Sequence, residues 1–128
     1  MRCVVTGTPY TVFGHGGKQV RDNIHSADLV AGFLAYARDP KPAAVYNIGG
    51  GRFSNCSHIE AFTIAEEITG LEARTDYVDQ ARTGDHQWWI SSTARFEQHY
   101  PDWKLTYDVP AILREMYEAN QEVWKPTA

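Results

Sequence analysis

The sequence predicts an α/β fold with few strands and about four helices. Short segments rich in β-branched and aromatic residues alternate with longer segments whose apolar residues recur at helical spacing. Glycine or proline lies between most of these segments, where it ends the preceding helix or strand. A chain of 128 residues is long enough to bury a core, and we expect residues 1–128 to form a single domain.

The N-terminal quarter predicts one strand followed by a glycine-rich turn. Residues 1–7 form an apolar run that is too brief for a complete helix and is closed by Gly7 in a cap or turn. Residues 10–13 have strand propensity and stop at Gly14. The segment from 14 to 25 is expected to be a turn that carries Lys18 and Arg21.

The next elements are a helix and a buried strand. Ser26 is expected to cap a helix over residues 27–38, with Asp28 in the first turn, where the helix dipole favours a carboxylate. Residues 44–48 are almost all apolar, which predicts a strand buried on both faces. The three glycines at 49–51 resemble turns that bring backbone close to a ligand, and residues 52–56 are expected to form a loop.

The second helix is the most clearly marked element. Ser57 and Glu60 have the spacing of a capping box, and Gly70 ends the helix after Thr69. Its predicted buried face consists of Ile59, Phe62, Ala65 and Ile68.

The C-terminal part predicts two strands and two helices. Residues 73–78 and 87–90 are expected strands, separated by a polar loop. Ser91 or Ser92 is expected to cap a short helix that reaches His99, and residues 103–107 are expected to be extended. Asp108 caps a last helix with an apolar stripe, and the tail from 125 onward is expected to fray. The stripe consists of Val109, Ile112, Leu113, Met116, Asn120 and Val123.

Composition excludes several classes of protein. The chain has 12 Lys and Arg against 16 Asp and Glu, a net charge of −4, which argues against a nucleic-acid-binding surface. Two distant cysteines favour a reducing, cytoplasmic location over a disulfide framework. The sequence contains no apolar run near 18 residues and no signal-peptide pattern, so no membrane association is expected.

The residues give no sign of catalysis or of a metal or cofactor site. The five histidines have no paired spacing, and neither cysteine lies in a thiol motif. The glycines at 49–51 are not a dinucleotide fingerprint, because Ser54 stands where the third glycine would be. We therefore expect no metal, no catalytic residue and no cofactor bound by this chain alone.

Two arginines are the best candidates for ligand binding. Arg21 and Arg82 each lie in a polar stretch near a glycine and an aspartate. Guanidinium groups bind phosphate oxygens bidentately, so two that converge on one ligand would suit a diphosphate. The alternative, that Arg21 with Asp22 and Arg82 with Asp85 form ordinary surface ion pairs, is equally open at this point.

Four motifs in order resemble one known family. They are Tyr10-Thr-Val-Phe-Gly14 with Gly17-Lys-Gln-Val-Arg-Asp-Asn-Ile-His25, then Asp28, Val45-Tyr-Asn-Ile-Gly-Gly50 and Arg82-Thr-Gly-Asp85. Together they resemble the C-terminal part of extended short-chain dehydrogenase/reductases. These are NAD-dependent nucleotide-sugar epimerases and dehydratases, and the likeness is greatest to the CDP-paratose 2-epimerase branch.

The resemblance implies a fold and a set of site residues. It implies the substrate-binding part of an extended fold, α+β when taken alone, with the Rossmann NAD-binding half absent. Thr11 and Phe13 would contact the nucleotide base, and Asp85 would hydrogen-bond the ribose. Arg21 and Arg82 would hold the diphosphate, whereas Lys18 and Gln19 would lie at the rim of the site.

The family's catalytic groups have no counterpart here. Its glycine-rich NAD fingerprint, catalytic Ser or Thr and Tyr-x-x-x-Lys pair all precede the part that matches. Tyr100 and Lys104 have the spacing of that pair, but Pro101 prevents the helix that the pair requires. We therefore expect a chain that binds a nucleotide sugar, with a CDP-sugar favoured, and is catalytically incomplete.

Assembly expectations follow from the same resemblance. NAD would belong to the complete enzyme, with an N-terminal NAD-binding partner supplying its site. An open sheet edge near residues 45–48 would pair with another chain, which predicts a homo-oligomer. The alternative is a non-enzymatic nucleotide-binding or oligomerisation module derived from the family.

Overall fold

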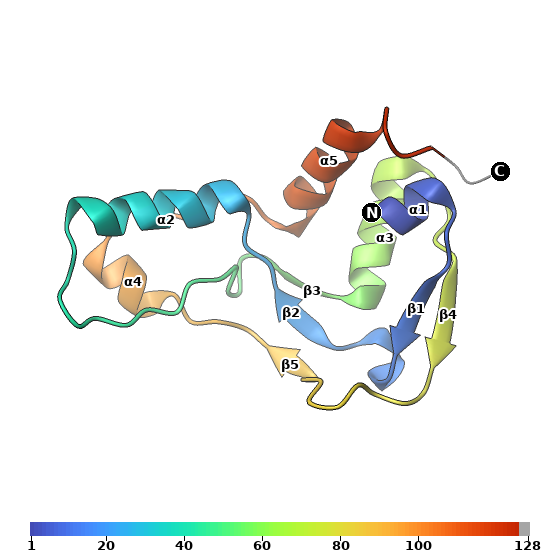
Figure 1. The fold of residues 1–128 in the computed structure, drawn as a ribbon, viewed down its shortest axis with the longest axis horizontal. Coiled ribbons are helices and arrows are strands. Elements are labelled where there is room, and N and C mark those ends of the chain that lie inside the picture. The colour runs from blue at the N-terminus through green and yellow to red at the C-terminus, as the bar shows by residue number, and fades with distance from the viewer. Residues whose placement is uncertain (126–128) are drawn as a thin grey trace.

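The computed structural model describes residues 1–125 and shows two groups of helices joined by short strands (Figure 1). One group contains α2 and α4, and the other contains α1, α3 and α5 beside β1 and β4. The α/β class is confirmed. The helices are α1 Arg2–Thr6, α2 Ser26–Arg38, α3 His58–Thr69, α4 Ala94–His99 and α5 Val109–Asn120. The strands are β1 Tyr10–Phe13, β2 Val20–Asp22, β3 Asn55–Ser57, β4 Thr75–Val78 and β5 Trp88–Trp89, with a 3₁₀ turn at His15–Gly17.

The strands form two small sheets. β1 pairs with β4 in parallel, from Tyr10 opposite Thr75 to Phe13 opposite Val78. β2 is the middle strand of the other sheet, antiparallel to β3 and parallel to β5. Both β2 and β3 lie where the sequence predicts turns or loops. Their three-residue sequences, Val-Arg-Asp and Asn-Cys-Ser, are too short to show an alternating pattern, so only pairing with distant segments makes them strands.

The predicted strand at 44–48 is wrong. This segment forms no ladder with any other described residue, and its side chains alternate between partly buried and exposed. Tyr46 and Ile48 pack against the aromatic core, whereas Val45 is 76% exposed. An apolar run indicates burial but does not specify a pairing partner.

Local capping signals predict several helix boundaries. The hydroxyl of Ser57 accepts a hydrogen bond from Glu60 N at 3.2 Å, and the Glu60 carboxylate accepts from Ser57 N at 2.7 Å. These hydrogen bonds lower the pKa of Glu60, because they stabilise its charged form. Gly7 and Gly70 end α1 and α3 in the left-handed region, and Asp108 caps α5. All four predictions are confirmed.

Two other caps are wrong. α2 begins at Ser26 and is capped by His25, whose Nδ1 accepts from Ala27 N at 3.1 Å. Thr93, and neither Ser91 nor Ser92, precedes α4. In each case a residue adjacent to the predicted cap occupies the cap position.

The core is smaller than the apolar stripes predict. Its centre is an aromatic cluster between α2 and α4, formed by Phe96, Tyr100 and Trp103. In α3 only Ala65 is fully buried, and Ile59 is 46% exposed. The stripe of α5 is buried only at Val109, while Met116 is among its exposed members. Much apolar surface of both helices therefore faces outward.

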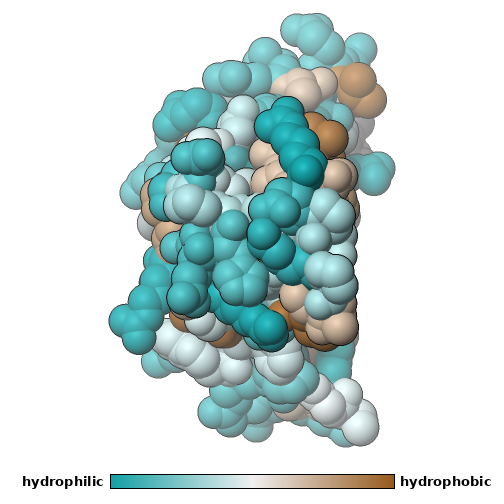
Figure 2. Space-filling view, turned by 90° about the vertical axis from the view of Figure 1, so that its left-hand side faces the viewer, coloured by the Kyte–Doolittle hydropathy of each residue, from teal (hydrophilic) through white to brown (hydrophobic). Residues whose placement is uncertain are grey.

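α2 also has an exposed apolar side, formed by Val30, Phe33 and Leu34. The end of the molecule seen in Figure 2 is mainly hydrophilic, with apolar side chains gathered at its edges.

No helix among residues 1–125 is both long and apolar enough to cross a membrane. Residues 126–128 of the tail that is expected to fray lie outside the described residues.

Asp28 connects α2 to the segment before α5. Its side chain is buried, at 3% exposure, and accepts hydrogen bonds from Thr106 N at 2.9 Å, Thr106 Oγ1 at 2.6 Å and Tyr107 N at 3.1 Å. Trp103 Nε1 donates to the Asp28 carbonyl at 2.9 Å. Burial raises the pKa of this carboxyl, but the hydrogen bonds outweigh it and the net pKa is lowered. Asp28 lies in the first turn of α2, as the sequence predicts, and its side chain is in addition a tertiary anchor.

Replacing Asp28 with Asn should destabilise the fold by about 2 kcal/mol or more, because the amide cannot accept all these bonds. Because the folded-state pKa is depressed, the carboxylate stabilises the native protein fully above its unfolded pKa, and this contribution is lost as pH falls through the folded pKa. Urea denaturation between pH 7 and pH 3 measures both effects. The wild type should lose stability below about pH 4, and the difference from Asp28→Asn should shrink there. A constant difference at all pH values would contradict the role of the charge.

Candidate functional site

Two loops meet at the carboxyl ends of β1 and β4. Because these strands are parallel, the segments after Phe13 and Val78 leave from the same edge of the sheet. Gly14 N donates to Val78 O at 2.8 Å, and a Cβ at Gly14 would lie 2.6 Å from the Cα of Ala81. Gly14 also has φ 63° and ψ 175°, which only glycine adopts readily. This close approach places Arg82 beside the end of β1.

Asp85 is the centre of the polar contacts at this edge. Arg21 Nη2, on β2, donates to Asp85 Oδ1 at 2.7 Å, and Gln19 Nε2 donates to Asp85 Oδ2 at 3.3 Å. The alternative ion pairs, Arg21 with Asp22 and Arg82 with Asp85, do not occur. Asp22, the next residue along β2, instead accepts from Gly51 N and Ser91 N at 3.0 Å each. Successive side chains of a strand point to opposite faces, which separates the two roles.

The second arginine lies over an aromatic ring. The guanidinium carbon of Arg82 is 4.7 Å from the ring centroid of Phe13, a cation–π distance. Within residues 1–125 no carboxylate forms an ion pair with Arg82. Lys18 is exposed at the end of the 3₁₀ turn and does not line the small cavity beside Phe13 and Arg82. Arg82 is therefore available to an anionic ligand.

A cavity of about 60 Å³ lies among these groups. Five of the seven residues predicted for the site line it: Thr11, Phe13, Gln19, Arg82 and Asp85, together with Tyr10 and His58. Arg21 is held at its edge through Asp85. Gln19, predicted at the rim, is instead buried, with 4% of its surface exposed. The structure therefore brings most of the predicted residues together.

His58 is the residue that sequence reasoning misses. It is the first residue of α3, and the capping box fixes the orientation of that helix end. Burial lowers the pKa of His58, Asp85 raises it, and Arg21 and Arg82 lower it further, so the pKa lies below its ordinary value. The only signal in the sequence is a histidine directly after a helix cap, which does not by itself indicate a site.

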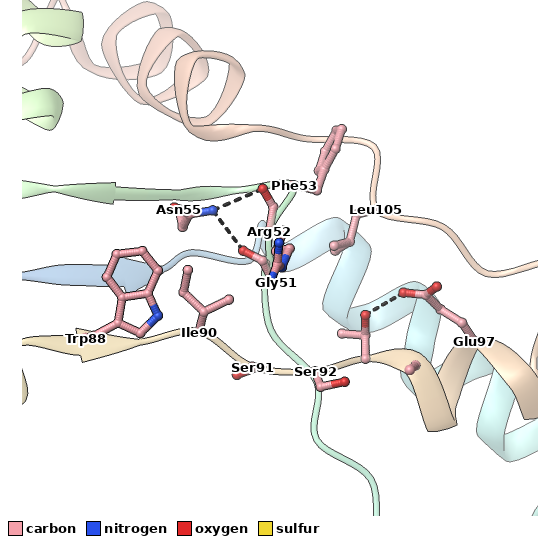
Figure 3. A pocket seen from close by; sticks show the side chains of 13 residues that line it. Gly51, Arg52, Phe53, Asn55, Trp88, Ile90, Ser91, Ser92, Glu97 and Leu105 are labelled. Carbon is pink, nitrogen blue, oxygen red and sulfur yellow. Dashed lines mark hydrogen bonds between the residues drawn. The ribbon is translucent and has the colours of Figure 1, made fainter.

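A larger groove of about 870 Å³ lies beyond β5 and contains none of the predicted residues. Figure 3 shows Trp88, Phe53 and Arg52 on one side of it and Glu97 on the other. Glu97 accepts a hydrogen bond from the Thr93 hydroxyl, and Asn55 donates to the carbonyls of Gly51 and Arg52. These polar groups satisfy one another, and we find no cationic pair for a diphosphate among them.

The triple glycine is explained by packing. A Cβ at Gly50 would lie 2.1 Å from the Asn23 carbonyl oxygen, and one at Gly49 would lie 2.5 Å from Asp22 Oδ2. The glycines thus allow the loop to approach the end of β2. The sequence-based expectation that they bring backbone close to a ligand is replaced by a close approach of backbone to backbone.

Replacing Gly14 with Ala should displace the loop that carries Arg82 and reduce stability by about 2 kcal/mol or more. Gly16→Ala is a matched control, since Gly16 has φ 59° but no atom within 4 Å of the position that a Cβ would occupy. The control should cost only about 1 kcal/mol, from the positive φ alone. Chemical denaturation of both variants tests this, and equal losses would contradict a specific clash with Ala81.

No family model matches the sequence, but curated proteins do. UDP-glucose 4-epimerase GEPI48 of Cyamopsis tetragonoloba is 32% identical over 116 residues, covering 84% of this chain and 32% of the relative. UDP-glucose 4-epimerase 4 of Oryza sativa subsp. japonica is 28% identical, over 84% of this chain and 30% of the relative. CDP-paratose 2-epimerase of Salmonella typhi is 26% identical, over 90% of this chain and 34% of the relative. The chain thus spans about a third of the length of these relatives.

Solved structures share the fold. MoeE5 in complex with UDP-glucuronic acid and NAD has a TM-score of 0.84 and 27% identity, covering 94% of this chain and 39% of that protein. UDP-glucuronic acid 4-epimerase from Bacillus cereus, with UDP-glucuronic acid and NAD, has a TM-score of 0.82 and 21% identity, covering 96% and 38%. The sequence and fold similarities confirm the resemblance to the C-terminal part of extended short-chain dehydrogenase/reductases.

Proposed function

We propose that this chain, a relative of the C-terminal part of NAD-dependent nucleotide-sugar epimerases in the extended short-chain dehydrogenase/reductase family, binds the nucleotide sugar. The observation that carries the proposal is the convergence of Arg21, Arg82 and Asp85 at one edge of the β1–β4 sheet. The guanidinium groups of Arg21, on β2, and Arg82, in the loop after β4, come from different elements and lie at or beside one small cavity. Two such groups suit a ligand with two adjacent phosphates.

The roles of the lining residues follow from their chemistry. Arg82 and Arg21 hold the diphosphate, and Asp85 accepts hydrogen bonds from the ribose. Phe13 and Thr11 contact the base, with the Phe13 ring as an apolar platform beside Arg82. Lys18 contributes only long-range attraction at the rim, since its ammonium is exposed. Solved structures of relatives hold UDP-sugars, and one curated relative is named for a CDP-sugar, so uracil and cytosine are both candidate bases.

The described residues do not fit NAD. Atoms of Asp22, Asn23 and Ser91 pack directly against the glycine turn at 49–51. They fill the space beside its backbone that a pyrophosphate would need. Tyr100, the one tyrosine followed by a lysine four residues later, is buried, and its hydroxyl donates to the Asp39 carbonyl at 2.9 Å. We propose that an N-terminal NAD-binding part supplies both the cofactor and the catalytic groups.

Exposed apolar surface supports such a partner. The accessible surface is 8495 Å², whereas a folded monomer of 14.5 kDa would expose about 6,900 Å². The excess, about 1,600 Å², is about twice the surface that one partner buries in a standard protein interface, about 800 Å². Val30, Phe33 and Leu34 of α2 and the unpaired segment at 44–48 belong to the surface that the NAD-binding part, or a second copy in a homo-oligomer, would cover.

The complete protein would be a nucleotide-sugar epimerase, and the alternative of a non-enzymatic module is not favoured, since the curated relatives are named as epimerases. Free thiols at Cys3 and Cys56 are consistent with a cytoplasmic location, which is part of the proposal.

UDP or CDP should raise the thermal midpoint of the chain, because a ligand that binds only the folded state stabilises it. Arg82→Gln and Arg21→Gln should each weaken binding about tenfold or more, through loss of a charge-assisted hydrogen bond. Arg114→Gln, an exposed position on α5, is the matched control and should bind like the wild type. Differential scanning fluorimetry with millimolar UDP and CDP tests this. No shift with either nucleotide would count against the proposed site.

The chain alone should show no epimerisation of UDP-glucose or a CDP-sugar with added NAD, and NAD alone should not shift its melting. Activity should appear when an NAD-binding part of a relative is added or fused at the N-terminus. Coupled product assays measure both conditions. Turnover by the purified chain alone would refute the proposal that its catalytic groups lie elsewhere.

A further inference from the structure

His25 joins α2 to α5 through both nitrogens of its ring. Nδ1 accepts a hydrogen bond from Ala27 N at 3.1 Å and so caps α2, while Nε2 lies 3.2 Å from Oε1 of Glu115 on α5. The ring stacks on Tyr107, with 3.9 Å between the centroids and 21° between the planes, and only 14% of the His25 side chain is exposed. A largely enclosed imidazole thus contacts three segments of the chain.

These contacts define the protonation state of the ring. A backbone N–H only donates, so Nδ1 must offer its lone pair to Ala27 N and carry no proton. In the neutral ring the proton is then on Nε2, which donates to the Glu115 carboxylate. An imidazolium has a proton on each nitrogen and cannot accept a hydrogen bond. Protonation of His25 therefore breaks the cap of α2.

The charges around the ring oppose one another. The carboxylates of Glu115, on α5, and of Asp28, in the first turn of α2, attract a positive charge at His25. Burial raises the pKa of Asp28, its hydrogen bonds lower it, and a positive charge on His25 lowers it further, so the two side chains interact. The positive end of the α2 dipole repels that charge, and Tyr107 meets the ring through its aromatic face. Protonation thus removes the cap of α2 and strengthens the contact with Glu115.

Loss of this cap affects the start of α2. The first N–H groups of a helix have no carbonyl partner within the helix, so Ala27 N depends on His25. Asp28 keeps its hydrogen bonds from the segment before α5, and these hold the rest of the helix in place. On the other side, residues 23–24 alone separate the cap from β2, the strand that carries Arg21. A frayed end of α2 therefore lies next to a strand of the candidate site.

We propose that His25 is a pH-sensitive cap: the neutral ring closes the start of α2 against α5, and protonation opens the start of α2 without unfolding the chain. Histidine is the side chain whose charge ordinarily changes between about pH 5 and pH 8, so acidification through this range operates the cap. This role is independent of the proposed nucleotide binding, and no ligand is needed to test it.

Hydrogen exchange of single amides, followed by ¹⁵N NMR on the whole chain from about pH 7.5 to about pH 5, tests this role. After correction for the intrinsic pH dependence of exchange, the protection of Ala27 N should fall about fivefold, the effect of losing one N-cap. Ala111 N is an internal control, because it also lies in a first turn and donates to a carboxylate, Asp108 Oδ1, at 2.9 Å. Its protection should stay constant. Unchanged protection of Ala27 N would overturn the inference.

Two variants separate the cap from the charge. Asparagine is a preferred N-cap and does not titrate, so His25→Asn should keep Ala27 N protected throughout this pH range. Glu115→Gln, at a half-exposed position, removes a carboxylate that favours the imidazolium and should move the loss of protection to lower pH. An equal fall in His25→Asn would overturn the inference, because the fall would then not depend on the imidazole. An unchanged midpoint in Glu115→Gln would contradict the contact between the ring and α5.

Discussion

The carboxylate of Asp28 holds the two helical groups of this chain together. It lies in the first turn of α2 yet accepts hydrogen bonds from Thr106 and Tyr107, which lead into α5. His25, the cap of the same helix, stacks on Tyr107 with 3.9 Å between the ring centroids. Its Nε2 lies 3.2 Å from Oε1 of Glu115 on α5. The core between α2 and α4 is small, so this polar junction fixes how the α2 group meets the α5 group. The position of β2, which leads directly into α2, depends on it in turn.

β2 connects α2 to the candidate site, because it precedes this helix in the chain and carries Arg21. Its three residues pair on both sides, and their alternation directs Arg21 and Asp22 to different tasks. The Asp22 carboxylate accepts hydrogen bonds from Gly51 N, in the glycine loop at 49–51, and from Ser91 N. Arg21 donates instead to Asp85. A shift of β2 by one residue would turn both side chains to the opposite face and break both sets of contacts. The central strand thus both joins separate segments of the chain and carries Arg21, one of the residues of the proposed binding site.

The chain retains two kinds of unsatisfied surface. Polar atoms around Asp85 lack partners, and apolar side chains on α2 remain exposed. Both are costly in an isolated protein, the first through desolvation and the second through contact with water. A ligand in the cavity and a neighbouring part on the apolar surface would relieve each cost separately. The similarity to proteins about three times as long fits this interpretation.

Most features that depend on neighbouring residues could be predicted from the sequence alone, although two helix caps lie one residue away from their predicted positions. Strand pairing and burial, which depend on distant partners, could not be predicted. The capping box at Ser57 and Glu60, the left-handed glycine ends and the cap at Asp108 are local hydrogen-bond patterns, and all occur as predicted. Motif order also indicated the family and the site residues, five of which line one cavity. Their roles in binding remain predictions.

The features that the sequence did not predict depend on distant partners. β2 and β3 are strands only because of pairing, and the apolar segment at 44–48 pairs with no strand among the described residues. Asp85 pairs with Arg21, 64 residues away, and not with the nearby Arg82. Gln19 and His58 belong to the site through burial, which no local pattern encodes. Local sequence specifies caps and turns because their donors and acceptors are close in the chain; pairing and burial are set by what the fold brings alongside.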